Sequence, residues 1–324
     1  MSQTGIAISI PPLSWAARHG RVLLIAGLAV GIALPGLAVV VKPWLSELVA
    51  LLLFLGALRV GPRQALGASR DVGFSIGAVA AFQLFLPVAF ASIFLVFGWH
   101  SPLATGLVLM AAAAPISGSP QITAMLGHDP APSLRLLVVG TALLPLTIIP
   151  AFWQTPALDD MASVFAAAGR LFALILVSTG LAFFVHRFVL RAENQETVRA
   201  IDGLSAIVMA VMVVGLMSAV GPAITGNPAG LALNLAAAFG ACFALQIATA
   251  LFLRIVGKGE IAVPVATVMG NRNIALFLTA LPATITDPLL LFIGCYQIPM
   301  FSTPILLRGF YRAVVGRTDG GRQV

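Results

Sequence analysis

Charged residues are scarce in this chain. Asp, Glu, Lys and Arg together make up 9% of its 324 residues, whereas 60% are hydrophobic. A soluble globular domain carries about 25% charged residues, so the composition excludes that class. It indicates a protein with several membrane-spanning helices.

Cysteine is rare as well, and the apolar segments lack acidic residues in their interiors. The two cysteines, Cys242 and Cys295, lie inside apolar segments, where a buried inert thiol is expected rather than a disulfide or a metal site. All 11 acidic residues and all 4 histidines fall at the ends of apolar segments or between them. Proton-coupled transporters normally use an Asp, Glu or His inside the membrane, so no proton carrier is predicted, and no cofactor is expected.

Ten apolar segments approach the length that crosses a bilayer, which is about 20 residues for a helix. The first is longer than the apolar stretch of about 7–15 residues in a secretory signal, so we expect it to be a retained transmembrane helix. The predicted spans are Val22–Val41, Trp44–Val60, Val72–Phe97, Leu103–Gly127, Ser133–Trp153, Met161–Val185, Gly203–Val220, Ala229–Val256, Ile261–Leu281 and Pro288–Arg308.

The basic residues predict the orientation. The net charge is +7, but Lys and Arg sit at the ends of the spans and form no continuous patch, which excludes a nucleic-acid-binding surface. Of the 18 basic residues, all except Lys42, Arg170 and Arg272 fall on the side of the N-terminus. Cytoplasmic loops carry the excess of Lys and Arg. We therefore expect a multi-pass protein of the cell (inner) membrane with both termini in the cytoplasm.

Ten spans divide into two halves of five, which have opposite topologies, as in many secondary transporters. The fourth span of each half is also interrupted. The interrupting residues are Pro115, Gly118 and Pro120 in span four, and Pro264 and Gly270-Asn271-Arg272-Asn273 in span nine. Two ordinary proline kinks are one interpretation. Because the interruptions fall at matching positions, we expect instead that they mark a binding site.

At these two interruptions the sequence resembles the bile acid:sodium symporter family. That family pairs a P-G-G-x-x-S-N-type break in span four with a G-M-Q-N-S-type break in span nine. The counterparts here are PISGSPQ, from Pro115 to Gln121, and GNRNI, from Gly270 to Ile274. The following run, HDPAPSLRLLVVGTALLPLTIIP, is similar to the family's short loop, serine-started fifth span and closing prolines.

This resemblance implies an all-α membrane fold in which ten helices form two inverted repeats. Residues 1–324 would be a single transmembrane unit with a panel domain, about 22–60 and 161–220, and a core domain, about 72–153 and 229–308. The broken spans four and nine would cross near the membrane centre. Substrate would bind between the two domains, and alternating access would move one domain against the other.

The chain departs from the family pattern at the sodium ligands. In sodium-coupled members a glutamate two residues before the span-nine glycine bridges two sodium ions, and that position is Val268 here. The span-four Ser-Asn pair becomes Pro120-Gln121, and the span-nine glutamine becomes Arg272. Gln83 and Ser133 are the other positions of this degraded ion site. Sodium needs converging oxygen ligands, so the sequence argues against sodium coupling; a sodium-coupled organic anion or bile acid symporter is the alternative.

Arg272 is unusual, because a charge at the bilayer centre costs about 2.5–3.5 kcal/mol even on the lenient insertion scale. Each half-helix that stops at a break, after Ala114 and after Met269, ends in unpaired carbonyls and about half a negative charge. In a structural interpretation, the guanidinium caps these carbonyls in place of a bound cation. In a functional one, it faces a cavity and pairs with a carboxylate.

Polar residues around the two breaks can satisfy freed backbone groups or contact a substrate, and the sequence leaves both open. The positive N-terminal ends of the second half-helices, near Gln121 and Ile274, favour an anion. The predicted substrate-binding residues are Arg272, Asn273, Asn271, Gly118, Ser119 and Gln121.

Together these patterns predict a secondary transporter of a small organic anion, not an enzyme, whose partners are that anion and the lipid bilayer. An intramembrane hydrolase is one alternative, prompted by Gly118-Ser119 with His128 downstream. Its Ser/His pair would have to lie within about 2.6–3.2 Å, and His128 is predicted in the loop beyond the break. A channel is another alternative, but no repeated polar stripe is visible to line a pore.

Overall fold

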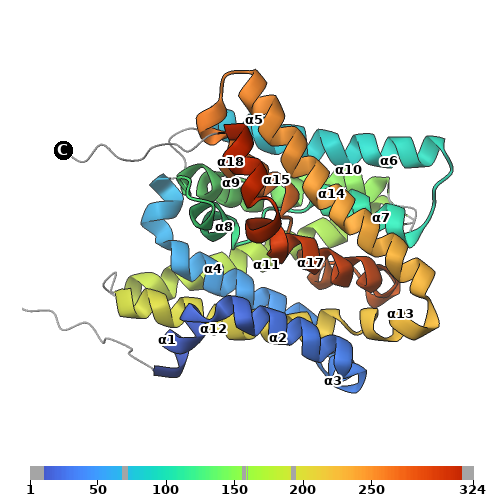
Figure 1. Cartoon of the computed structure of the whole chain (residues 1–324), viewed down its shortest axis with the longest axis horizontal. Coiled ribbons are helices and arrows are strands. Elements are labelled where there is room, and N and C mark those ends of the chain that lie inside the picture. Colours follow the sequence, from blue (N-terminus) through green and yellow to red (C-terminus); the bar gives the residue numbers. More distant parts are fainter. Residues whose placement is uncertain (1–10, 68–71, 155–157, 159, 191–194, 316–324) are drawn as a thin grey trace, which may run out of the picture. The chain divides into compact units, whose positions relative to one another are not determined.

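The regular secondary structure of the described part is helical, apart from one isolated β-bridge (Figure 1). The computed structural model describes residues 11–67, 72–154, 158, 160–190 and 195–315. The helices form two compact units, with residues 165–231 and 275–294 joining the N-terminal segment in the first and the remainder in the second. That these units act as panel and core domains stays a prediction.

The first unit is built mainly from the N-terminal helices and the helices near residue 200. Its elements are α1 (Pro11–Arg18), α2 (Gly20–Ala33), α3 (Pro35–Val41), η1 (Lys42–Trp44), α4 (Leu45–Gly67), most of α11 (Met161–Phe188), α12 (Gln195–Leu216), α13 (Val220–Gly226), most of η5 (Ile274–Thr279), α16 (Ala283–Thr286) and η6 (Asp287–Leu289).

The second unit holds both predicted interruptions. Its elements are α5 (Val72–Val79), the π-helical stretch η3 (Ala80–Phe85), α6 (Leu86–Val96), α7 (Pro102–Ala112), α8 (Ser119–Met125), α9 (Ala131–Thr147), α10 (Ile149–Trp153), most of α14 (Pro228–Ile255), η4 (Gly259–Ile261), α15 (Ala262–Gly270), most of α17 (Leu290–Leu306) and α18 (Arg308–Val315).

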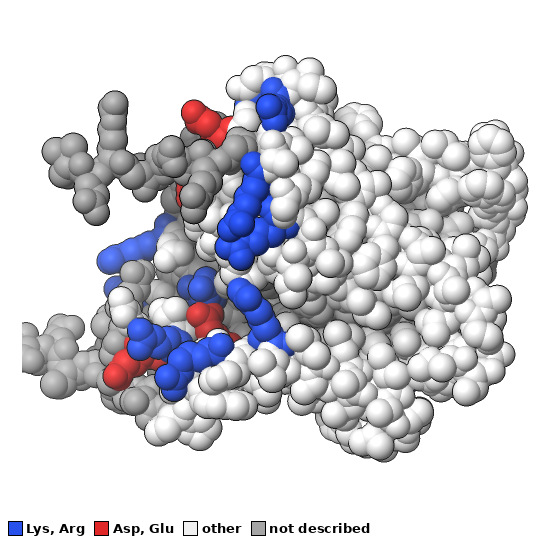
Figure 2. Space-filling model, viewed as in Figure 1, with Lys and Arg blue, Asp and Glu red and all other residues white. Residues whose placement is uncertain are grey.

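Six helical stretches are long and apolar enough to cross a membrane, and a bent pair, α1 with α2 at 81°, brings the number to seven if it counts as one span. The six are Pro35–Ala65, Gly73–Val96, Met161–Phe188, Gln195–Gly226, Pro228–Ile255 and Ala283–Leu306. Much of the surface that Figure 2 displays carries no charged side chain. The chain is thus a multi-pass membrane protein. Shorter apolar helices occupy predicted spans four, five and nine, so the ten-helix inverted repeat stays a prediction.

Side chains and prolines define where several helices begin. The Ser101 hydroxyl accepts the N–H of Ala104 at 3.2 Å, directly before Pro102 opens α7. The Asp160 carboxylate accepts the N–H of Ser163 at 2.6 Å at the start of α11. Such caps satisfy backbone donors that have no partner inside the helix. Proline at the first helical position loses no hydrogen bond.

Polar contacts within each unit join helix ends that the predicted orientation places on the same side. In the first unit, Lys42 pairs with Asp287 at 2.9 Å at one side, and Arg59 pairs with Asp202 at the other. In the second unit, the Lys258 ammonium lies 5.2 Å from the centre of a phenylalanine ring near the start of α5, that of Phe74. The compartment itself stays a prediction, and Arg70, Arg191, Arg317 and Arg322, which contributed to it, lie outside the described residues.

Helix α2 approaches α12 closely because glycines face it. A Cβ atom built on Gly27 would lie 2.6 Å from the Ala210 carbonyl oxygen, and one on Gly31 would lie 2.8 Å from the Met217 Cβ. The two glycines are four residues apart, the small-xxx-small spacing that lets membrane helices pack backbone to backbone. By contrast, a Cβ on Gly36 in α3 would meet nothing within 4 Å.

We expect Gly27→Ala to lower the free energy of unfolding by about 1–3 kcal/mol, because the added methyl group overpacks the α2–α12 contact. The measurement is the midpoint of thermal unfolding of the purified protein. Gly36→Ala is the matched control and should leave the midpoint unchanged or raise it. Equal midpoints for the two variants would contradict the close approach.

Candidate functional site

Two helices of the second unit stop and restart. Helix α7 ends at Ala112, Ala113 is extended (φ −64°, ψ 151°), and α8 begins at Ser119. Pro115 accounts for this interruption, because proline lacks an N–H and disfavours helical geometry in the residue before it. Helix α15 ends at Gly270, and Asn271 (φ −109°, ψ 89°) leads the chain out of it. The interruptions predicted in spans four and nine are confirmed.

The two interrupted segments lie against each other. Pro115 and Arg272 form an antiparallel β-bridge. The Ile116 N–H donates to the Asn271 carbonyl at 3.1 Å, and the Asn273 N–H donates to the Ala114 carbonyl at 2.8 Å. Buried backbone groups need hydrogen-bond partners within the protein, so each segment supplies partners that the other lost when its helix ended. We call this pair of segments, residues 113–117 and 271–273, the crossing.

Arg272 is buried at the crossing, with 2% of its surface exposed. Its Nε donates to the Met269 carbonyl at 3.0 Å and its Nη1 to the Ala113 carbonyl, also at 3.0 Å. The Met269 carbonyl belongs to the last turn of α15, and Ala113 directly follows α7, so both lie at helix ends where dipoles place partial negative charge. Among the described residues no carboxylate pairs with this guanidinium. The contacts are those of the structural interpretation.

A third carbonyl, that of Phe82, accepts from Arg272 Nη2 at 3.4 Å. Phe82 lies in the π-helical stretch η3, where Leu86 donates to the carbonyl five residues earlier, that of Ala81. In this pattern the donor to the Phe82 carbonyl would be residue 87, which is a proline without an N–H. Pro87 therefore frees the carbonyl that Arg272 uses.

Tyr296, from α17, completes the cap of α15. Its hydroxyl accepts the N–H of Arg272 at 3.1 Å and donates to the Gly270 carbonyl. The ring is fully buried. One phenol thus satisfies a donor and an acceptor at the end of the same half-helix.

The Asn271 side chain is held inside the protein. Its Nδ2 donates to the Thr267 carbonyl at 2.8 Å, and its Oδ1 accepts from the Thr303 hydroxyl at 3.1 Å. Asn271 is completely buried. Its carboxamide therefore supports the interruption, which is the backbone role that the sequence left open for it.

The six predicted substrate-binding residues lie at or near the crossing, at different depths. Arg272, Asn271 and Ser119 are buried, whereas Gly118, Gln121 and Asn273 are half-buried. In the amide orientation that best satisfies its hydrogen bonds, Gln121 Nε2 donates to the carbonyls of Ser117 and Gly118 at 3.1 and 3.2 Å. Its Oε1 is then left for other contacts. That any of the six binds a substrate stays a prediction.

The predicted ion-site positions pack against neighbouring protein groups, although Gln83 Oε1 is buried without a hydrogen-bond partner in the described part. Val268 lies in an apolar cluster with Leu136 and Leu253, and Pro120 is also buried. Gln83 Nε2 donates to the Gly140 carbonyl and to Thr147 Oγ1, both at 2.9 Å.

Ser133, the last of these positions, donates to the Pro264 carbonyl at 3.0 Å and lies 2.7 Å from the Thr123 hydroxyl. No group of three His, Cys, Asp or Glu residues that could hold a metal ion occurs in the described part.

Ser119 and His128, the pair that would be needed for hydrolysis, are not hydrogen-bonded to each other. The Ser119 hydroxyl is buried and has no hydrogen-bond partner among the described residues. No Ser–His hydrogen bond therefore activates this hydroxyl.

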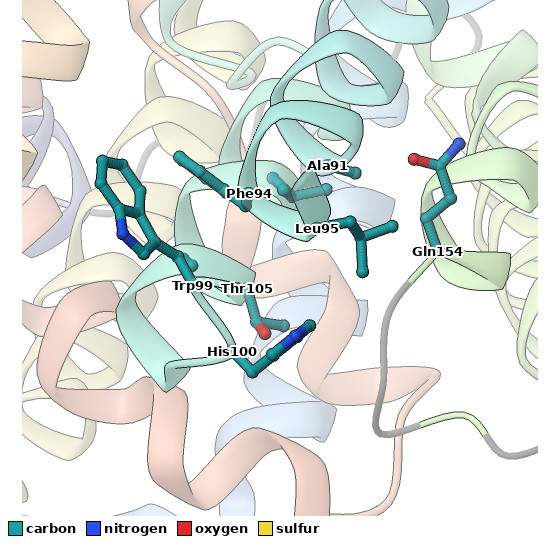
Figure 3. Close-up of a pocket in the computed structure, with 9 residues that line it drawn as sticks. Ala91, Phe94, Leu95, Trp99, His100, Thr105 and Gln154 are labelled. Atoms are coloured by element: carbon teal, nitrogen blue, oxygen red, sulfur yellow. The ribbon is translucent and has the colours of Figure 1, made fainter. Parts of the chain in front are cut away.

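Two hollows in the described part do not include any predicted site residue. One, of about 20 Å³, lies beside Trp99, His100 and Gln154 (Figure 3); a water needs about 10–15 Å³ by this measure, so it is too small for an organic substrate. The other, of about 380 Å³, is an apolar groove in the first unit beside Trp44 and Glu47.

Several residues that form or contact the crossing were not predicted from the sequence. They are Phe82, Ala113, Thr267, Tyr296 and Thr303. Phe82, Ala113 and Thr267 contribute backbone carbonyls, which leave no mark in the amino-acid type. Tyr296 offered a signal, since the chain has only 2 tyrosines and a phenol in an apolar span needs a partner.

Comparison of the chain with protein-family models and with curated proteins finds no match. The function is therefore argued from the crossing itself.

We expect Arg272→Met to destabilise the protein strongly, because it leaves three carbonyls without a donor, at about 1–3 kcal/mol for each buried unsatisfied group. The stability of Arg272→Lys should lie between those of Arg272→Met and the wild type, because one ammonium group cannot donate to all three carbonyls as the guanidinium does. Thermal unfolding measures the effect. Arg170→Met, at an exposed arginine of α11, is the control and should change little; an Arg272→Met protein as stable as this control would exclude the capping role.

Proposed function

We propose that the protein is a secondary transporter that moves a small organic anion of the carboxylate type across the membrane by alternating access. The observation that carries the proposal is the crossing, where two interrupted helices pair their backbones inside an apolar protein. Irregular backbone at membrane depth is tolerated only where it is buried in protein or lines a water-filled cavity. In transporters, discontinuous helices form the substrate and ion sites near the bilayer midplane.

The proposal includes the ten-helix inverted-repeat architecture of the bile acid:sodium symporters. The resemblance at Pro115–Gln121 and Gly270–Ile274 supports it, because both segments are interrupted in the structure where the family's segments are. The ion pair between Lys42 and Asp287 also supports this architecture, because it joins two helix ends that the predicted orientation places on the same side of the membrane.

Arg272 takes the place of a bound cation in this proposal. In sodium-coupled relatives, ions and a glutamate would balance the two negative helix ends. Here a permanent guanidinium donates to the carbonyls of both ends, through Ala113 and Met269, and Val268 replaces the acid. A cation that is part of the chain cannot be exchanged, so the transport modes that fit are uniport and exchange of anions.

The expected charge of the substrate follows from the surroundings of Arg272. Arg272 is the only charged residue in either interrupted span, 103–127 or 261–281. Because Arg272 offsets the two negative helix ends, these ends offer little negative charge to a cation, and the positive N-terminal ends near Gln121 and Ile274 favour an anion. Because the guanidinium donors point at protein carbonyls, we assign direct substrate contacts to the half-buried Asn273, Gln121 and Gly118 instead.

We expect no difference in thermal stability between sodium chloride and choline chloride at equal ionic strength. An ion that binds the folded state raises its stability by mass action, and this measurement requires no known substrate. Potassium chloride is the control for the size of the cation. A shift specific to sodium would show that ion sites persist despite Val268 and Pro120, and would support the sodium-coupled symporter instead.

A panel of small carboxylates should contain at least one that raises the unfolding midpoint, whereas amines of the same size should not. For that carboxylate, we expect Asn273→Ala and Gln121→Ala to weaken binding by roughly tenfold, the effect of about one lost hydrogen bond of 1.4 kcal/mol. Arg272→Lys should leave the affinity nearly unchanged while lowering stability. A large loss of affinity in a folded Arg272→Lys protein would assign substrate binding to Arg272. No stabilising carboxylate at all would contradict the anion assignment.

A further inference from the structure

The last described helix, α18, has one charged and exposed face and one buried face. Arg308 and Arg312 are exposed, one helical turn apart. Tyr311, between them in sequence, is 1% exposed, and Leu307, just before the helix, is also buried. Helix α18 packs against α15, the half-helix that ends at the crossing (Figure 1).

A chain of buried hydrogen bonds leads from α18 to the crossing. The Tyr311 hydroxyl donates to Gln246 Oε1 at 3.0 Å, and Gln246 Nε2 donates to the Thr303 hydroxyl at 3.1 Å. The Thr303 hydroxyl lies 3.1 Å from two acceptors, the Pro299 carbonyl and Asn271 Oδ1, and in this chain it donates to Asn271 Oδ1. The Asn271 backbone in turn accepts the N–H of Ile116 in the other segment of the crossing. All four side chains in this chain are buried.

Displacement of α18 would break this chain at its first bond. Gln246 Oε1 would lose its phenol, and a buried polar atom without a partner is costly. The cost is lowest if Gln246, Thr303 and Asn271 rearrange together, which loosens the end of α15. The docked position of α18 and the closed crossing therefore favour each other.

The exposed face of α18 suits an anionic partner. Residues four apart lie on one face of a helix, so both guanidinium groups can approach one phosphate, and neither forms a salt bridge with a described residue. The sequence places two more arginines shortly afterwards, Arg317 and Arg322. Basic residues next to a membrane span are attracted to the anionic lipids of the cytoplasmic leaflet, the side predicted for this helix.

We propose that α18 binds the headgroup phosphate of an anionic phospholipid through Arg308 and Arg312, and that the chain Tyr311–Gln246–Thr303–Asn271 couples this binding to the crossing. Lipid that binds the docked helix stabilises it by mass action, and the crossing opens less often. This coupling does not depend on what the protein transports, so it stands or falls separately from the transport proposal.

The test is hydrogen exchange of the Ile116 and Asn273 amides in the full-length protein, reconstituted in phosphatidylcholine with or without phosphatidylglycerol. Both amides donate across the crossing. We expect both amides to exchange about fivefold more slowly with the anionic lipid. Two arginines near such a surface can account for an effect of this size. Equal rates in the two lipid mixtures would overturn the proposal.

Variants separate binding from coupling. In an Arg308→Gln/Arg312→Gln protein the lipid effect should vanish, whereas Arg254→Gln, which removes an exposed arginine at the end of α14, should keep it. Loss of the effect in both proteins would show a general charge effect and overturn the assignment to α18.

Tyr311→Phe should still bind phosphatidylglycerol, measured by lipid co-purification, but exchange at the crossing should no longer respond. If this variant does not fold, Thr303→Val breaks the same chain at another bond. A lipid response that persists in a folded variant would overturn the coupling. Inorganic phosphate added to phosphatidylcholine samples should have no effect, and a response to it would overturn the assignment to lipid.

Discussion

The structure of the second unit depends on one constraint: every backbone N–H and C=O at the crossing must find a partner without water. An amide left unpaired in an apolar medium costs several kcal/mol. Two interrupted helices release such groups together, and the arrangement satisfies them in three ways. The segments bond to each other through Ile116 and Asn273, Tyr296 bridges the end of α15, and Arg272 donates to the carbonyls of Ala113, Met269 and Phe82.

The same constraint explains the residues that surround the crossing. Pro115 interrupts the chain after α7, which frees the Ala113 carbonyl, and Pro87 frees the Phe82 carbonyl, so both prolines create acceptors that the guanidinium then uses. A guanidinium can do this because its donors point in several directions in one plane. The positive charge of Arg272 is thus compensated locally by the partial negative charges at the ends of two helices.

The sequence predicted the interruptions but not what surrounds them. Pro115 and the run Gly270–Asn273 stand out in apolar segments, and the structure breaks both helices there. The sequence predicts one continuous span at Val22–Val41, whereas α2 and α3 are separated at Leu34, before Pro35. The groups that Tyr296 bonds could not be predicted, because spans that are apolar on all sides carry little periodicity to show which face is buried. Backbone carbonyls are invisible to any pattern of side chains.

A cation that belongs to the chain also changes the energetics of transport. A symporter draws on the gradient of the ion that it releases, and Arg272 can never be released. For a carrier without a coupling ion, the membrane potential acts directly on an anionic cargo, at about 2.3 kcal/mol per elementary charge per 100 mV. With a cell interior that is electrically negative, this force drives a carboxylate outward. A uniporter built on this crossing would therefore export its substrate unless an inward concentration gradient outweighs this force.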